Sequence, residues 1–168
     1  MSRIPIKGFL PNTLIDWEGK VAAEIFLSGC NFRCPFCHSG YLVYDRENEC
    51  IPLESILACI EREKGWIDGV VISGGEPTLC PALEGLCVEF RNRNLGVKLD
   101  TNGSNPALIG RLVNLGLLDF VSLDVKAPLD ERYSAATGVM EPPVEQVRES
   151  VRLLMRSSID YEFRTTVV

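Results

Sequence analysis

Three cysteines follow the first apolar stretch of the chain in a Cys-x3-Cys-x2-Cys pattern, at Cys30, Cys34 and Cys37. Thiolates at this spacing are close enough along the chain to bind three corners of a small iron–sulfur cube. An ordinary [4Fe–4S] electron carrier uses four cysteines. Three cysteines leave one iron with an open position, which substrate chemistry at a cluster requires. The loop therefore predicts a cluster that takes part in a reaction.

Other sites use similar spacings and remain alternatives. Cys34-Pro-Phe-Cys37-His38 matches the C-x-x-C-H pattern of haem attachment, but that attachment takes place outside the cytoplasm. A thioredoxin-like pair of Cys34 and Cys37 would leave Cys30 unexplained. A structural zinc site could use the three cysteines with His38, although two adjacent residues would chelate one ion awkwardly.

The remaining cysteines are predicted to be buried small hydrophobes on helices or at helix entries; they are Cys50, Cys59, Cys80 and Cys87. The total of seven is odd, and the N-terminus lacks an apolar signal segment. Both observations favour a reducing cytoplasm over a disulfide framework.

A glycine-rich cluster, Gly74-Gly75-Glu76-Pro77, follows the second expected core strand. Glycines let the backbone approach a ligand closely and adopt turns that are closed to other residues. Glu76 would place a carboxylate at the same rim, suited to an ammonium group. The alternative is a tight strand-to-helix turn, in which a glutamate in the first turn favours the helix dipole.

The third strand ends in Asp100, Thr101 and Asn102, which could bind a small polar ligand or a cation, or could cap the next helix. The fourth strand alternates, so that Asp124 and Lys126 share one face. Burying these charges is costly unless they pair or bind something, so a structural ion pair is the alternative.

The fifth strand places Arg164 and Thr166 on one face. These residues either reach the same region as the clusters above or belong to an exposed edge. The strand is apolar and lies at the end of the chain, where a natural domain rarely leaves an edge bare. We expect truncation, a partner that covers this edge, or a very compact domain.

Strands that alternate with helices predict an α/β fold with a parallel sheet. Too few units are present for a closed eight-stranded barrel, so we expect one domain over residues 1–168, a partial (β/α) barrel of about five to six parallel strands. An extended segment at Gly8–Trp17 predicts an N-terminal β-hairpin. The expected strands are Val21–Ser28, Gly69–Ser73, Gly96–Thr101, Asp119–Lys126 and Tyr161–Val168, and the expected helices are Pro52–Lys64, Pro81–Asn94, Pro106–Leu115 and Pro142–Ser157.

Composition excludes several classes of partner. The formal net charge of −6 argues against binding to a phosphate backbone, which needs a basic face. The sequence contains no apolar run long enough to cross a bilayer. We therefore expect neither nucleic acid nor membrane as a partner. In parallel sheets, ligands bind beyond the carboxyl ends of the strands, where all the clusters described above lie.

Together these clusters resemble the radical S-adenosylmethionine (radical SAM) superfamily. The resemblance rests on the cysteine pattern with Phe36 before its last cysteine, and on Gly74-Gly75-Glu76-Pro77. Leu99-Asp-Thr-Asn-Gly103 and Asp124-Val-Lys126 are similar to motifs of glycyl-radical-enzyme activases, including activators of anaerobic ribonucleotide reductase. The superfamily core has six βα units, so this chain is similar to a core without its last strand.

The resemblance implies a role for each matched position. The three cysteines would bind a [4Fe–4S] cluster, and S-adenosylmethionine would bind its fourth iron. Gly74, Gly75 and Glu76 would hold the methionine ammonium, with Phe36 near the adenine. The ribose or carboxylate would contact Asp124 and Lys126, with Arg164 as a further candidate, and Asp100, Thr101 and Asn102 would line the same pocket, with a monovalent cation beside Asp100 and Thr101.

The implied reaction is reductive cleavage of S-adenosylmethionine to a 5′-deoxyadenosyl radical. In the activases this radical takes a hydrogen atom from a glycine of a partner enzyme, with ferredoxin or flavodoxin as the electron donor. A radical enzyme that modifies a small molecule or a peptide is one alternative. A non-catalytic iron–sulfur or zinc module is another, and it would leave the glycine and Asp-x-Lys clusters without a role.

Overall fold

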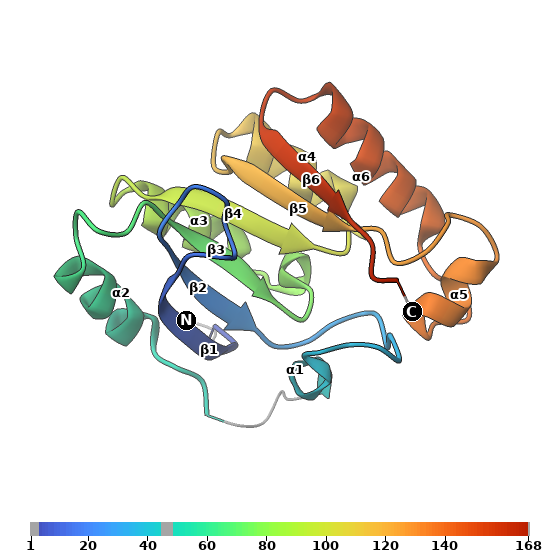
Figure 1. Ribbon diagram of the computed structural model, residues 1–168, viewed down its shortest axis with the longest axis horizontal. Helices are drawn as coiled ribbons and strands as arrows, with labels where there is room; N and C mark the ends of the chain where they lie inside the picture. Colours follow the sequence, from blue (N-terminus) through green and yellow to red (C-terminus); the bar gives the residue numbers. More distant parts are fainter. Residues whose placement is uncertain (1–3, 45–48, 168) are drawn as a thin grey trace.

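The computed structural model describes residues 4–44 and 49–167, in which a six-stranded sheet is flanked by helices (Figure 1). The elements in chain order are β1 (Ile6–Thr13), β2 (Ala22–Leu27), α1 (Gly40–Tyr44), α2 (Leu53–Arg62), β3 (Gly69–Gly74), the 3₁₀ helix η1 (Pro77–Leu79), α3 (Leu83–Arg91), β4 (Gly96–Thr101), α4 (Pro106–Asn114), β5 (Phe120–Asp124), α5 (Arg132–Thr137), α6 (Val144–Arg156) and β6 (Asp160–Arg164). Within these described ranges, no helix is long and apolar enough to cross a membrane.

The sheet has the strand order β1-β2-β3-β4-β5-β6 and is open. β1 pairs with β2 in the antiparallel direction, and every later neighbour pairs in parallel. This arrangement confirms the predicted α/β fold, with its N-terminal hairpin and its partial barrel of parallel strands. Because parallel strands end at the same edge, all five β2–β6 carboxyl ends lie together.

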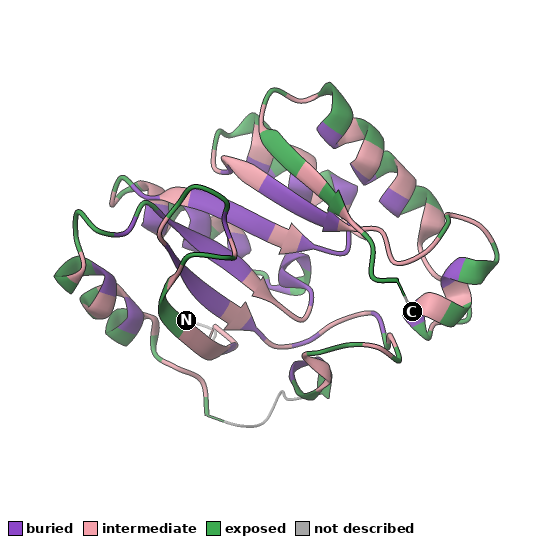
Figure 2. Cartoon of the chain, viewed as in Figure 1, coloured by how far each residue is buried: buried purple, intermediate pink, exposed green. Residues whose placement is uncertain are grey.

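The parallel strands have one apolar and one polar face, because successive side chains point to opposite sides. Ile25, Ile72, Leu99 and Val121 are fully buried in the main core. Helices α3 and α4 cover this face of the sheet (Figure 1), and the interior of the central strands is buried (Figure 2). The opposite face carries most of the charged residues of the strands, and we call it the polar face.

A second, smaller apolar cluster lies on the polar face of the sheet. Trp17 lies in the connection between β1 and β2 and packs with Ala22, Val71 and Phe120. Its ring is 6.3 Å from that of Phe120. The burial of this aromatic ring therefore helps to anchor the connection to the sheet.

The expected elements are all present, with shorter ends in most cases. The last strand was expected over Tyr161–Val168, but β6 ends at Arg164, and Val168 lies outside the described residues. The extended segment was expected at Gly8–Trp17, whereas β1 begins at Ile6 and ends at Thr13. Sequence patterns did not reveal α1, η1 or α5, which are too short for a helical period to be recognised.

The carboxyl ends of β2 and β3 are joined by close backbone contact at the two glycines. The amides of Gly75 and Glu76 donate to the carbonyls of Leu27 and Gly29, both at 2.8 Å. A Cβ atom on Gly75 would lie 2.2 Å from the Gly29 carbonyl oxygen. Gly74 has φ of +116°, a conformation that favours glycine. Both glycines are therefore needed for strand-to-strand packing, whatever else they contact.

We predict that Gly75→Ala destabilises the protein by about 1–3 kcal/mol, because its Cβ forces two backbone segments apart. Gly85→Ala is the matched control: no atom lies within 4 Å of its Cβ position in α3, so it should stabilise the helix by about 0.5–1 kcal/mol. Chemical denaturation of both variants measures the difference. Equal unfolding free energies for the two variants would contradict the prediction.

Candidate active site

A pocket lies at the carboxyl ends of the parallel strands and gathers most of the residues singled out from the sequence. Its walls come from the cysteine loop after β2, the turn after β3, and the ends of β4, β5 and β6. The lining residues include Cys30, Cys34, Phe36, Cys37, Gly74, Gly75, Asp100, Thr101, Asn102, Asp124, Lys126 and Arg164. Segments far apart in sequence thus contribute to one site.

The cysteine loop packs against helix α5 and the glycine that follows it. The Phe32 side chain is buried and packs edge-on against Tyr133, with 6.3 Å between the ring centroids. The Arg33 amide donates to the Thr137 carbonyl at 2.7 Å. A Cβ on Gly138 would lie 2.3 Å from the Arg33 carbonyl oxygen, so a glycine is needed here. Helix α5, which contains Tyr133 and Thr137, therefore supports the loop that carries the thiols.

The three thiols differ in environment. Cys30 and Cys34 are half-buried and Cys37 is exposed. Burial raises the pKa of Cys30 to about 11 and also raises the pKa of Cys34. A thiol must lose its proton to bind a metal, so a metal that bound at this loop would release protons.

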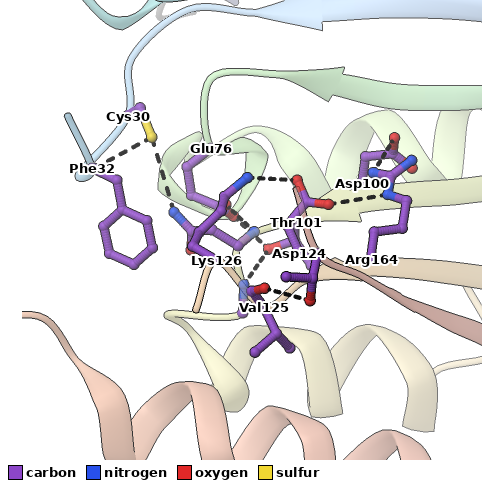
Figure 3. A network of polar contacts seen from close by, with 12 residues as sticks. Cys30, Phe32, Glu76, Asp100, Thr101, Asp124, Val125, Lys126 and Arg164 are labelled. Carbon is purple, nitrogen blue, oxygen red and sulfur yellow. Dashed lines mark hydrogen bonds and ion pairs between the residues drawn. The ribbon is translucent and has the colours of Figure 1, made fainter. Parts of the chain in front are cut away.

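The Glu76 carboxylate does not line the pocket but lies beneath its wall, 1% exposed. One oxygen accepts from the Thr78 amide at 3.0 Å, the Thr78 hydroxyl at 2.5 Å and the Thr101 hydroxyl at 2.7 Å. The other accepts from the Asn102 amide at 2.7 Å. Burial raises the pKa of this carboxyl, and the donated hydrogen bonds oppose that effect. Figure 3 shows Glu76 joined to Thr101.

This geometry supports the alternative interpretation of Glu76 as part of a tight strand-to-helix turn, because its side chain caps η1. The alternative interpretation of Asp100, Thr101 and Asn102, that they cap the next helix, is wrong. The cap of α4 is Asn105, whose side chain accepts from the Leu108 amide at 3.2 Å.

Charged side chains from the ends of three strands form a linked group (Figure 3). Arg164 donates to Asp100 at 2.8 Å and to Asp124 at 3.0 Å. Lys126 donates to Asp124 at 2.8 Å. Burial raises the pKa of Asp100, and the facing Arg164 and Lys98 oppose that shift. These residues pair with one another and line the pocket as well.

Two further ionisable side chains lie deeper on the polar face of the sheet. Lys98 is 4% exposed, lies 3.7 Å from an Asp100 oxygen, and donates to the Asp16 carbonyl. Glu24 is 5% exposed. Its pKa is raised to about 8 by burial first, and then by the nearby Asp16 and Asp100 carboxylates. The sequence analysis did not single out these residues, although the strand alternation places both on the polar face.

Other residues of the site were also missed. Phe32 and Ser73 line the pocket, and the period-2 pattern of β3 could have indicated Ser73. Tyr133 is fully buried and accepts a 3.4 Å hydrogen bond from the Lys126 amide, but no sequence signal pointed to it. Two cysteines expected to be buried, Cys50 and Cys59, are only half-buried, whereas Cys80 and Cys87 are buried.

The donor set fits an iron–sulfur cluster together with a small charged ligand. Cys30, Cys34 and Cys37 are not in disulfides, and all three line one pocket. Within the described ranges, no three Cys, His, Asp or Glu side chains are grouped to hold a single metal ion. One buried Asp100 oxygen accepts no hydrogen bond, although the Lys98 ammonium lies 3.7 Å from it. Lys126 and Arg164 add positively charged donors to the wall that Asp100 and Asp124 make acidic. A ligand with both an ammonium and a carboxylate suits this wall.

Known sequences and structures match the chain along most of its length. The profile of the Radical SAM superfamily matches residues 25–168. A protein of Methanocaldococcus jannaschii, provisionally named a glycyl-radical enzyme activating enzyme, is 32% identical over 167 residues, which are 97% of this chain and 68% of that protein.

Other matches carry different names. The 7-carboxy-7-deazaguanine synthase of Hyperthermus butylicus is 36% identical over 92 residues, 54% of this chain and 38% of its own length. The solved structure of native anSMEcpe with bound AdoMet superposes with a TM-score of 0.57 at 20% identity, over 81% of this chain and 40% of that one. The structural match shows a shared fold.

We predict that Glu76→Gln destabilises the protein by about 1–3 kcal/mol, because one amide hydrogen would face the Asn102 or Thr78 N–H and leave a buried group unpaired. The matched control is Glu84→Gln, which removes a carboxylate paired with Arg111 at the surface and should cost at most about 1 kcal/mol. Urea unfolding compares the two variants. A Glu76→Gln protein as stable as the control would contradict the stabilising role of the four hydrogen bonds to the Glu76 carboxylate.

We predict that Glu24 makes stability fall as pH rises from 4.5 to about 8, the ordinary and folded pKa values of this carboxyl. Between these values the folded state keeps the proton and the unfolded state has lost it, so the unfolding free energy falls by up to about 1.4 kcal/mol per pH unit. Glu24→Gln should flatten this slope, whereas Glu84→Gln should retain it. Urea unfolding of the reduced protein at several pH values provides the test, and equal slopes in all three proteins would exclude this role.

Proposed function

This chain belongs to the Radical SAM superfamily, and we propose that it activates a glycyl-radical enzyme. In this proposal Cys30, Cys34 and Cys37 each bind one iron of a [4Fe–4S] cluster, and S-adenosylmethionine occupies the adjoining pocket. When bound and reduced, the cluster supplies the electron that cleaves S-adenosylmethionine to methionine and a 5′-deoxyadenosyl radical. The single observation that carries the superfamily chemistry is that the three thiols and the charged strand ends share one pocket.

The protein's own residues bind and orient the ligands. Phe36 lies in the cysteine loop and offers an aromatic face for the adenine. Lys126 and Arg164 offer donors for the methionine carboxylate or the ribose, with Asp124 between them. Because these side chains are already paired with one another, little side-chain ordering remains when the ligand binds.

The ammonium of S-adenosylmethionine is proposed to bind where the glycine turn meets β4. Gly74 and Gly75 line the pocket there, and one Asp100 oxygen accepts no hydrogen bond and has only the Lys98 ammonium, at 3.7 Å, facing it. In this proposal Glu76 does not bind the methionine ammonium, the role that its motif implied, because its carboxylate already accepts four hydrogen bonds. It holds the turn and the β4 end in place. A monovalent cation beside Asp100 and Thr101 remains part of the proposal.

The activase assignment is supported by the extent of the sequence match. The Methanocaldococcus jannaschii relative aligns with 97% of this chain, whereas the deazaguanine synthase of Hyperthermus butylicus aligns with 54%. We therefore propose a glycyl-radical enzyme as the protein substrate, ferredoxin or flavodoxin as the electron donor, and the cytoplasm as the location. Modification of a small molecule is the second candidate, because of the higher identity of 36% in the shorter match.

Reductive cleavage of S-adenosylmethionine is tested separately from the identity of the protein substrate. Anaerobically reconstituted protein with dithionite and S-adenosylmethionine should form 5′-deoxyadenosine, measured by liquid chromatography. Cys34→Ala should lower the rate at least about 100-fold, because a cluster that has lost one of its three protein ligands no longer supplies the electron and the loss falls on the chemical step. Cys59→Ala, a half-buried cysteine of α2 outside the pocket, should retain the wild-type rate. No product from a fully loaded wild-type protein would refute the proposed chemistry.

The protein substrate requires a separate readout. The same reaction is run with a glycyl-radical enzyme from the source genome, and the organic radical is observed by electron paramagnetic resonance. A signal that changes when glycine is deuterated at Cα supports the activase. Formation of 5′-deoxyadenosine with no such radical on any glycyl-radical enzyme of that genome would favour the small-molecule alternative.

A further inference from the structure

The side chain of Asn102 bridges the end of β4 to the cysteine loop. Its Nδ2 donates to Asn31 Oδ1 at 2.8 Å and lies 3.9 Å from the Cys30 sulfur, in hydrogen-bonding geometry. Asn31 in turn donates from Nδ2 to the Ser104 hydroxyl at 2.9 Å. The two amides therefore connect the loop that carries the thiols to the turn that follows β4.

The orientation of the Asn102 amide is determined by its partners. The Ser104 backbone N–H, which can only donate, lies 2.9 Å from Asn102 Oδ1. Oδ1 must therefore face Ser104, and the two N–H groups must face the loop. One N–H is used by Asn31 Oδ1, and the other is directed at the Cys30 sulfur. A flipped amide would place an oxygen against both Asn31 Oδ1 and the sulfur.

The backbone of Asn102 is held as firmly as its side chain. Its amide donates to the buried Glu76 carboxylate at 2.7 Å, and the residue is 5% exposed. A side chain in this position cannot turn toward solvent when the loop binds a ligand. The donor is therefore preorganised for the sulfur.

The Cys30 sulfur receives a second hydrogen bond, from the Phe32 backbone amide at 3.3 Å (Figure 3). The sulfur is half-buried, whereas Cys37 is exposed to solvent. In a partly buried site, N–H donors have a larger electrostatic effect than they have in water. The iron bound by Cys30 would thus have the more shielded and the more strongly hydrogen-bonded ligand.

We propose that Asn102 is a positioning residue that raises the reduction potential of the cluster by donating an N–H···S hydrogen bond to Cys30. This inference rests on the proposed cluster. Reduction adds negative charge to the cluster and its thiolate ligands, and a donor directed at a sulfur stabilises that charge. Hydrogen bonds to the sulfurs are among the factors that set such potentials.

The experiment is a redox titration of anaerobically reconstituted protein, followed by visible absorption and electron paramagnetic resonance. Asn102→Ala should shift the midpoint potential to more negative values, up to a tenfold change in the reduction equilibrium, or about 59 mV for one electron. Asn31→Ala is the matched control, because it breaks the amide bridge but leaves the Asn102 donor held by Ser104. Its potential should stay near that of the wild type.

Each outcome decides the proposal. An unchanged potential in Asn102→Ala, or an equal shift in Asn31→Ala, overturns it. A wild-type protein that binds no cluster, by iron and sulfide analysis, would refute the proposed function instead. If Asn102→Ala fails to fold, wild-type protein with ¹⁵N in its asparagine side chains is measured in the reduced state. A hyperfine coupling of an asparagine ¹⁵N to the cluster supports the hydrogen bond, and its absence overturns the proposal.

Discussion

The buried carboxylate of Glu76 imposes the constraint on which the site depends. A carboxylate that is 1% exposed must have its charge compensated, and here four hydrogen bonds from Thr78, Thr101 and Asn102 provide the compensation. The donors come from two segments, the turn after β3 and the end of β4. Satisfying one buried group thus fixes two walls of the pocket relative to each other.

The glycines before Glu76 extend this constraint to the cysteine loop. Gly75 lies so close to the Gly29 carbonyl that a methyl group would not fit, and the Glu76 amide donates to that carbonyl. The loop is supported on its other side by Phe32 and Tyr133. Residues of the glycine motif therefore contribute mainly through backbone and packing, and the thiols are held between two rigid supports.

The polar face of the sheet carries the charged residues because the other face is buried. Parallel strands must bury one face against helices, so polar side chains gather on the other. Asp100, Asp124 and Arg164 come from three neighbouring strands and compensate one another. A pocket with paired charges can accept a ligand that carries both signs without leaving an isolated charge buried. The proposed cofactor chemistry and the stability of the sheet thus use the same residues.

The sequence by itself determined the alternation of strands and helices, the cysteine loop and the positions of the polar strand ends, because periodicity and motif spacing are local properties. The family resemblance implied that Asp124, Lys126 and Arg164 lie near one ligand, and the structure places the three side chains at one pocket. The sequence could not determine where the Glu76 side chain lies, since that depends on donors 25 and 26 residues away. Nor could it reveal Tyr133, or the direction of the Asn102 amide toward Cys30, 72 residues distant. Such long-range contacts exist only once the sheet register has brought the strand ends together.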